Sequence, residues 1–168
     1  MNKKTVQAII YVIISIVSIV KPNISGKIFF DYSRNLETDP FNSFNIKRTY
    51  LTYENSKNDS VSFRVTYDVG KNDAGSAQTA FLKIAMVNWK TSFGDISIGM
   101  QGMNMYKTME NTWGHRFISK GAMGEYKFSS SADIGVGFKR SWGLVHTSVL
   151  ITNGCGYKKT EEDTHKKT

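Results

Sequence analysis

The ten residues from Val61 to Gly70 constrain the fold of this chain more than any other stretch. Apolar or aromatic side chains occupy every second position, and polar or charged side chains fill the positions between them. Because side chains alternate between the two faces of a β-strand, this pattern predicts a strand with one apolar and one polar face. Its length matches the ~9–11 residues that a tilted strand needs to cross a bilayer. Two structures fit the pattern: a surface strand of a soluble sandwich, or a barrel strand between lipid and water.

The composition favours a β-protein and limits its chemistry. The chain has 168 residues, only two prolines, and many glycine, aromatic and β-branched residues. Its mean hydropathy of -0.33 argues against a bundle of transmembrane helices but not against a barrel, whose interior side chains are polar. Cys155 is the only cysteine, so we expect no intramolecular disulfide and no thiolate metal cluster. We also expect no cofactor.

The chain is basic. Its formal net charge is +8, and +5 remains without Lys3, Lys4 and Lys21. The basic residues are spread singly through the predicted strands instead of forming a stripe, which argues against nucleic acid as a partner. An excess of positive charge favours anionic solutes or an anionic surface.

The N-terminus has the pattern of a secretory signal peptide. A short cationic segment precedes an uncharged apolar run from Val6 to Val20. This run is shorter than the ~20 residues of a transmembrane helix and has the length of a signal-peptide core. We expect residues 1–25 to direct export and residues 26–168 to form the mature domain; an uncleaved anchor is the alternative.

Seven strands are predicted after this segment, and the connections between them alternate in length. Three short connections, of five to seven residues, alternate with three longer ones, of which Gly102–Ala132 is by far the longest. Outer-membrane barrels have short turns at one end and long loops at the other, so the alternation favours a barrel. The predicted strands are Lys27–Tyr32, Asn45–Tyr53, Val61–Val69, Ala80–Trp89, Asp95–Gln101, Asp133–Phe138 and Leu144–Thr152.

The faces of the last three strands can be assigned, whereas those of the second and fourth cannot. In the second strand, Ile46 falls on the same face as Arg48 and Tyr50, and the fourth strand is apolar on both faces except for Lys83. Four aromatic residues lie near the short connections, as in the interfacial girdle of a barrel: Tyr53, Trp89, Phe93 and Trp142. Ordinary packing at a sheet edge is the alternative interpretation.

The chain resembles the phosphate-selective porin O/P family of outer-membrane barrels. The resemblance covers nearly all of the mature chain and rests on six short segments in order: Phe44–Tyr53, Phe63–Gly70, Ile98–Gly102, Thr112–Lys120, Ser129–Val136 and Asn153–Lys158. It implies an all-β fold, a closed antiparallel transmembrane barrel of about sixteen strands. It also implies a Gram-negative outer-membrane location, lipid as a partner, and a homotrimer of the full-length protein. By this resemblance, the loop Gly102–Ala132 folds into the barrel and narrows it.

Seven strands are about half of such a barrel, and they leave two edges whose backbone groups lipid cannot satisfy. We therefore expect this chain to be the N-terminal part of a longer porin, or to complete a barrel by oligomerisation. The charged tail Lys158–Thr168, which lacks a terminal aromatic residue, fits the first expectation.

The expected function is passive diffusion of small anionic solutes, phosphate among them, through a channel lined by basic residues. The expected pore-lining residues are Arg64, whose strand has clear faces, together with Arg48 and Lys83. Asp68 lies roughly 13 Å along the same face, too far to pair with Arg64. Arg64 should therefore stay free for anions unless a neighbouring strand supplies a carboxylate. The expected constriction-loop residues are Lys107, His115, Arg116 and Lys120, opposed by Glu110 and Glu125; simple solvation of these charges is the alternative.

Two other classes compete with the porin. A secreted soluble β-sandwich that binds a ligand is the main alternative, because it also contains strands with alternating faces. A hydrolase would need a nucleophile, a base and an orienting group. His115 and His146 occur among many serines, but no motif joins them, so we expect no catalytic or metal site.

Overall fold

A computed structural model describes residues 23–34, 42–72 and 78–161 of the chain. Residues 1–22, which carry most of the expected signal peptide, lie outside the described residues. The first strand begins at Asn23, three residues ahead of the expected start of the mature domain. Within the described residues, no helix is long and apolar enough to cross a membrane.

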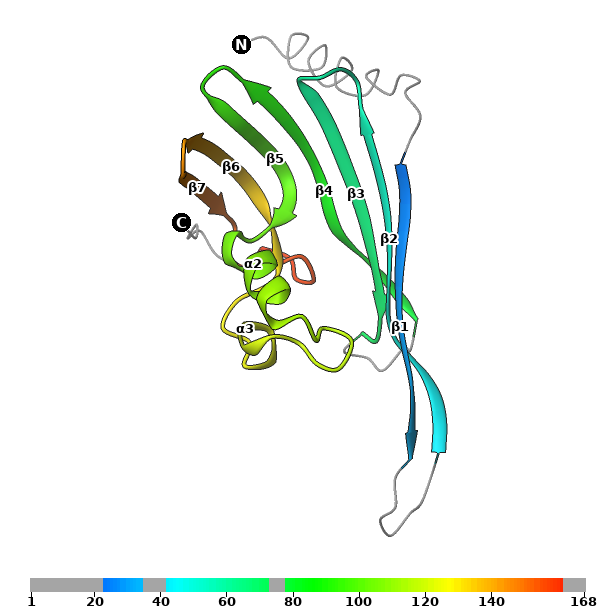
Figure 1. Cartoon of the computed structure of the whole chain (residues 1–168). Helices are drawn as coiled ribbons and strands as arrows, with labels where there is room; N and C mark the ends of the chain where they lie inside the picture. Colours follow the sequence, from blue (N-terminus) through cyan, green and yellow to red (C-terminus); the bar gives the residue numbers. More distant parts are fainter. Residues whose placement is uncertain (1–22, 35–41, 73–77, 162–168) are drawn as a thin grey trace.

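The described chain is all-β, with seven antiparallel strands in one open sheet (Figure 1). All seven predicted strands are present, and six are longer than predicted. They are β1 (Asn23–Arg34), β2 (Asn42–Ser56), β3 (Val61–Gly70), β4 (Thr79–Thr91), β5 (Gly94–Gly102), β6 (Ala132–Trp142) and β7 (Val145–Thr152). Each strand pairs with the next along the chain, so the sheet is a simple meander.

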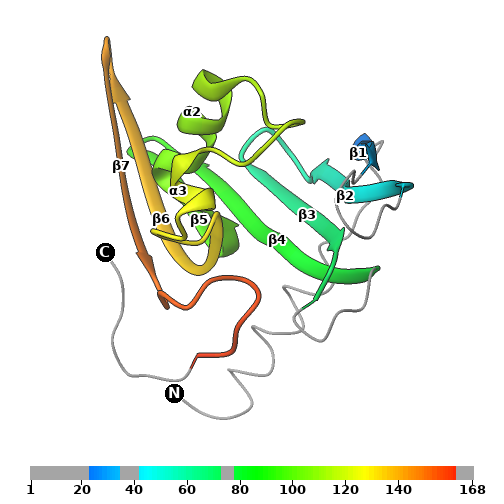
Figure 2. The ribbon, with the colours of Figure 1, turned by 90° about the horizontal axis from the view of Figure 1, so that it is seen from below.

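This meander puts the short connections together at one end of the sheet. The turns β2–β3, β4–β5 and β6–β7 lie at the upper end in Figure 1, whereas β1, β3 and β5 end, and β2, β4 and β6 begin, at the lower end. The predicted alternation of loop ends is therefore confirmed. The sheet curves, so it has one concave and one convex face (Figure 2).

Two β-bulges explain why the faces of β2 and β4 could not be read from the sequence. The β1–β2 register shifts at Lys47, because Phe29 is opposite Arg48 whereas Phe30 is opposite Ile46. Ile46 therefore lies on the opposite face from Arg48, which corrects the grouping made from strict alternation. An extra residue in one strand reverses the facing of every residue beyond it.

The second bulge lies in β4. Thr66 is opposite Ile84 whereas Tyr67 is opposite Leu82, and Lys83 is the extra residue. Leu82 and Val87 consequently share the convex face although they are five positions apart, a spacing that strict alternation would place on opposite faces.

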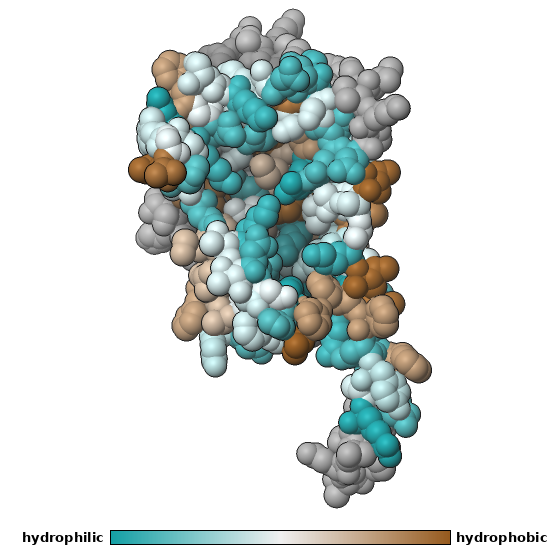
Figure 3. Space-filling view, viewed as in Figure 1, coloured by the Kyte–Doolittle hydropathy of each residue, from teal (hydrophilic) through white to brown (hydrophobic). Residues whose placement is uncertain are grey.

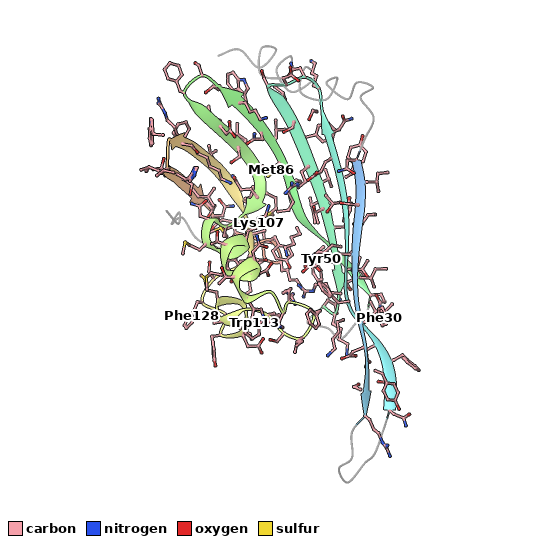
Figure 4. The ribbon with its side chains drawn as sticks, viewed as in Figure 1. Phe30, Tyr50, Met86, Lys107, Trp113 and Phe128 are labelled. Carbon is pink, nitrogen blue, oxygen red and sulfur yellow. The ribbon has the colours of Figure 1, made fainter. Side chains whose placement is uncertain are left out.

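The convex face is predominantly apolar on all seven strands, with Thr49, Arg140 and Thr147 among the exceptions, and most of its large apolar side chains are exposed. The register places Tyr67 beside Leu51 and Leu82, and it continues this apolar surface through β5, β6 and β7. Figure 4 shows Phe30 directed away from the concave side, on which Tyr50 and Met86 lie. The exposed convex residues include Ile24, Ile28, Phe30, Leu51, Tyr67, Leu82, Val87, Trp89, Ile98, Ile134, Val136, Phe138, Val145, Val149 and Ile151.

The concave face is polar, and little apolar surface is buried on it. Among the described residues, only Tyr106, Ala132 and Leu150 are buried apolar side chains. The buried polar side chains, by contrast, include Thr66, Asp68, Ser97, Gln101, Asp133 and Thr152, which the register places on the concave face. A soluble sheet normally buries its apolar face against a second layer. In the described chain, the apolar face of the sheet is exposed instead, and the buried polar side chains lie on the other face.

The long connection after β5 packs on the concave side (Figures 1 and 2). It contains helix α2 (Asn104–Trp113) and the one-turn helix α3 (Ala122–Glu125). The sequence pattern predicts a long loop here but not these two helices. Helix α2 ends at Gly114, which has the left-handed φ of 68° and donates its N–H to the Glu110 carbonyl. The hydroxyl of Tyr106 ties α2 to the Ser129 carbonyl near the end of the loop.

Candidate functional site

The candidate site is a basic cavity between the concave face and the loop that follows β5. Its volume is about 310 Å³. Figure 3 shows hydrophilic side chains around the hollow on this side of the molecule. Six basic side chains and one carboxylate, Glu110, line the cavity. The basic residues are Arg48, Lys83, Arg116, Lys120, Lys127 and Lys158.

Arg48 and Asp68 form an ion pair in the wall of this cavity. Arg48 Nη1 lies 3.1 Å from Asp68 Oδ2, and the Asp68 side chain is 1% exposed. The Tyr157 hydroxyl donates a hydrogen bond of 2.6 Å to the same carboxylate oxygen. Burial, followed by this hydrogen bond to an anion, raises the pKa of Tyr157, so the phenol stays protonated. The Asp68 carboxylate is therefore engaged by Arg48 and Tyr157 in the wall of the cavity.

Lys83 reaches the cavity because the bulge in β4 turns it inward. Its ammonium group lies 4.7 Å from the centre of the Tyr50 ring and 5.8 Å from that of Tyr157. Both distances fall within the range of a cation–π interaction, which holds the charge without neutralising it.

Arg64, the strongest candidate from the sequence, is paired. It forms an ion pair with Glu54, the residue directly opposite on β2. The neighbouring strand β2 thus supplies a carboxylate, that of Glu54, which occupies Arg64 and competes with anions for its guanidinium. Arg64 still lies on the concave face, because Glu54 and Thr66 share its side of the sheet.

The cavities along the concave face share lining residues and form a continuous row. A second cavity shares Lys83, Glu110 and Arg116 with the first and extends to Arg64. A third continues from Arg64 past Glu54 toward the short turns. The row therefore runs from the loop end of the sheet to the turn end.

The loop after β5 reaches across this row to the far wall of the sheet. The Arg116 guanidinium lies 5.7 Å from the Phe29 ring centre on β1, and its Nε lies 3.4 Å from Glu110 Oε1. Lys120 lines the cavities on both sides of this crossing. Of the predicted loop residues, the structure thus brings Arg116 and Lys120 to the site.

The other two predicted loop residues lie elsewhere. Lys107 is exposed on α2 (Figure 4) and lines none of the cavities described above. His115 is exposed; its Nδ1 lies 2.7 Å from the Trp113 carbonyl, and its ring packs between those of Trp113 and Phe117.

Sequence reasoning missed three residues of the site: Lys127, Tyr157 and Lys158. Lys127 has a left-handed φ of 55°, which is uncommon for a residue other than glycine. Tyr157 is 89 residues from Asp68 in the sequence, so no local pattern links them. The glycines at 154 and 156 do signal a sharp turn after β7, which brings the next residues back over the sheet.

Among the described residues, a serine and a histidine that could serve a hydrolase lie together on the β6–β7 hairpin. Ser141 and His146 are hydrogen bonded at 2.8 Å on the β6–β7 hairpin, but both are exposed. No hydrogen bond or ion pair to a carboxylate is found for His146 within residues 23–34, 42–72 and 78–161, so an orienting group is missing there. In the same ranges, no group of three His, Cys, Asp or Glu residues could hold a metal ion.

Comparisons with known proteins gave no match: no family model fits the chain, and neither a curated protein nor a solved structure resembles it closely enough to count.

Proposed function

We propose that this chain forms part of the wall of a porin-like outer-membrane channel for small anionic solutes. The observation that carries the proposal is the division of the sheet into an exposed apolar convex face and a polar, basic concave face. A transmembrane barrel needs this division, because its outer side chains contact lipid and its inner side chains contact water.

The dimensions of the convex face support the lipid contact. Its apolar positions on β4 run from Leu82 to Trp89, about 24 Å along the strand at the usual rise per residue. This is close to the ~25 Å apolar band of outer-membrane barrels. Trp89, Phe93 and Trp142 are more than half exposed at the short-turn end, where an interfacial girdle would lie.

The charges of the concave face support selection of anions. Arg48 and Arg116 have carboxylate partners, whereas Lys83, Lys120 and Lys127 have no carboxylate within salt-bridge distance in the described chain. Uncompensated basic groups around a water-filled path raise the local concentration of anions. Phosphate, chloride and small organic anions all fit a path of this kind.

A channel requires further strands beside β1 and β7. The outer edges of both strands lack a strand partner in the described chain, and lipid does not tolerate unpaired backbone groups. Strands from a longer porin or from further copies of the chain would pair these edges.

A matched pair of lysine substitutions tests the proposal. Lys120→Glu and Lys107→Glu change the net charge equally and lie on the same loop, but only Lys120 lines the path. In planar bilayers holding the assembled channel, Lys120→Glu should shift the reversal potential toward cations under a salt gradient. Lys107→Glu should shift it much less. Equal shifts, or a channel without anion preference in the unaltered protein, would contradict the proposal.

The soluble β-sandwich is less well supported. A sandwich packs two sheets face to face about 10 Å apart, and residues 23–34, 42–72 and 78–161 supply one sheet only. A sandwich would also have to cover the apolar convex face. Heat-dependent migration in detergent gels distinguishes a barrel from a sandwich.

A further inference from the structure

The segment after β7, residues 153–161, turns back over the concave face (Figure 1, red). Its first residues are tied to β6. Asn153 donates its N–H to the Ile134 carbonyl at 3.1 Å, and Gly154 donates its N–H to Asp133 Oδ2 at 2.6 Å. Asp133 is 2% exposed and also accepts the N–H of Ile134, so the base of the segment is fixed.

The backbone of the segment needs its glycines to make this turn. Gly154 and Gly156 have φ values of 99° and 84°. A β-carbon at Gly156 would also lie 2.5 Å from the Cβ and Oγ atoms of Ser130. The segment is therefore shaped to lie against the loop that follows β5.

The far part of the segment reaches β3 and β4. Tyr157 donates its N–H to the Ala132 carbonyl at 3.1 Å and its hydroxyl to Asp68 on β3 at 2.6 Å. The next residue, Lys158, places its ammonium group 3.8 Å from the centre of the Phe81 ring on β4. The Tyr157 side chain thus connects β6 to β3 across the two strands between them.

We infer that residues 153–161 form a second constricting segment in the path, in addition to the loop after β5, and that Tyr157 holds this segment across the concave face. The constriction rests on the proposed function, whereas the attachment through Tyr157 does not. Tyr157 is a positioning residue: its hydroxyl holds the segment, and the segment delivers Lys158 to the wall of the basic cavity.

The position of Cys155 makes the attachment measurable without any channel activity. Cys155 is half-buried within the segment, and its thiol lies 3.8 Å from the Gly156 carbonyl oxygen and 3.6 Å from that of Lys159. It is the only cysteine of the chain, so a thiol reagent reports on this segment alone. Release of the segment should expose the thiol to solvent.

The test compares Tyr157→Phe with Tyr126→Phe. Both substitutions remove one phenol hydroxyl, but Tyr126 is 72% exposed and makes no contact with Asp68. The rate at which N-ethylmaleimide modifies Cys155 is measured with the full chain in detergent micelles. Tyr157→Phe should raise the rate roughly ten- to hundredfold, because a hydrogen bond to a charged group is lost. Tyr126→Phe should leave it unchanged.

Folding is checked by far-ultraviolet circular dichroism, and Asp68→Asn provides a second variant. The amide oxygen still accepts the Tyr157 hydroxyl but carries no charge, so the rate should lie between those of the unaltered chain and Tyr157→Phe. A rate equal to that of the unaltered chain in both Tyr157→Phe and Asp68→Asn would overturn the attachment.

The conductance of the assembled channel tests the constriction. Tyr157→Phe should raise the single-channel conductance, and Tyr126→Phe should not. Faster labelling of Cys155 with unchanged conductance would overturn the constriction, because the segment would then lie outside the path. If the unaltered protein shows no channel, the proposed function fails, and the constriction with it, while the labelling rates still decide the attachment.

Discussion

Arg64 on β3 and Glu54 on β2 face each other directly and form an ion pair on the concave face. The charge of Arg64 is therefore balanced at close range, and the basic character of the path depends on residues nearer the loops. Both side chains are partly exposed, so the pair is screened by solvent and contributes little to stability.

The pairing predicts opposite effects of its two partners on selectivity. Glu54→Gln should increase the anion preference of the assembled channel, because it leaves Arg64 unbalanced. Arg64→Gln should decrease the preference by leaving Glu54 unbalanced, and Arg64→Glu should decrease it further. Reversal potentials at low and high salt measure these effects, which should shrink as salt screens the charges. Unchanged selectivity in all three variants at low salt would mean that this pair lies outside the conduction path.

Asp68 should matter for stability more than any exposed acidic residue. Asp68→Ala removes the partner of Arg48 and the acceptor of the Tyr157 hydroxyl in a buried place. Breaking a buried ion pair typically costs about 3–5 kcal/mol, and the partial exposure of Arg48 puts the expected loss at the lower end. The free energy of unfolding in urea measures it. Asp59→Ala, in the exposed β2–β3 turn, is the control and should change the free energy of unfolding by less than about 0.5 kcal/mol. Equal losses of this free energy in Asp68→Ala and Asp59→Ala would contradict the role of Asp68.

Because of Tyr157, we expect the free energy of unfolding to fall at alkaline pH. Its pKa is raised in the folded chain by burial and by the hydrogen bond to Asp68, whereas an unfolded tyrosine titrates near pH ~10. Below pH ~10 the phenol is protonated in both states, and its contribution is fully present. Above that value the unfolded chain loses the proton first, so stability falls as the pH rises.

The free energy of unfolding, measured against pH, checks this effect. Above pH ~10, the free energy of unfolding of Tyr157→Phe should fall less steeply with pH than that of the unaltered chain. Below pH ~10, the two curves should be parallel. Parallel curves throughout the alkaline range would show that Tyr157 is not buried beside Asp68.

Gly135 should tolerate no side chain. A β-carbon there would overlap the Ile151 carbonyl oxygen on β7 and lie 2.8 Å from Thr152 Cα. Gly135→Ala should therefore destabilise the β6–β7 pair by about 1–3 kcal/mol, measured by urea unfolding. Gly121→Ala is the control, because no atom lies within 4 Å of a β-carbon at that position. A loss no larger than that of the control would contradict the close approach of the two strands.

The strands were predictable because most of them follow strict alternation of apolar and polar residues. The assignment of residues to the two faces failed only where a bulge interrupts this alternation. Ile46 was grouped with Arg48, and the fourth strand could not be oriented, because Lys47 and Lys83 each add one residue to a strand, and nothing local in the sequence marks these insertions. Helix α2 could have been found from the spacing of Tyr106, Met109 and Trp113 before Gly114, although its start has no side-chain cap.

The site was only partly predictable. The facing of Arg64 followed from its strand, but its partner Glu54 depends on the register between β2 and β3, which alternation alone does not give. The contact between Tyr157 and Asp68 joins residues far apart in the sequence, so it required the fold.

The central claim is that the convex face contacts lipid and the concave face contacts water. Spin labels at single cysteines on β3 test it most directly, in a chain carrying Cys155→Ser and reconstituted into vesicles. Val65→Cys and Tyr67→Cys place the label on the convex face, and Ser62→Cys and Arg64→Cys place it on the concave face. Labels at 65 and 67 should be accessible to oxygen and shielded from a water-soluble nickel complex, and labels at 62 and 64 should show the reverse. Access of the nickel complex to labels at 65 and 67 equal to that at 62 and 64 would contradict the claim.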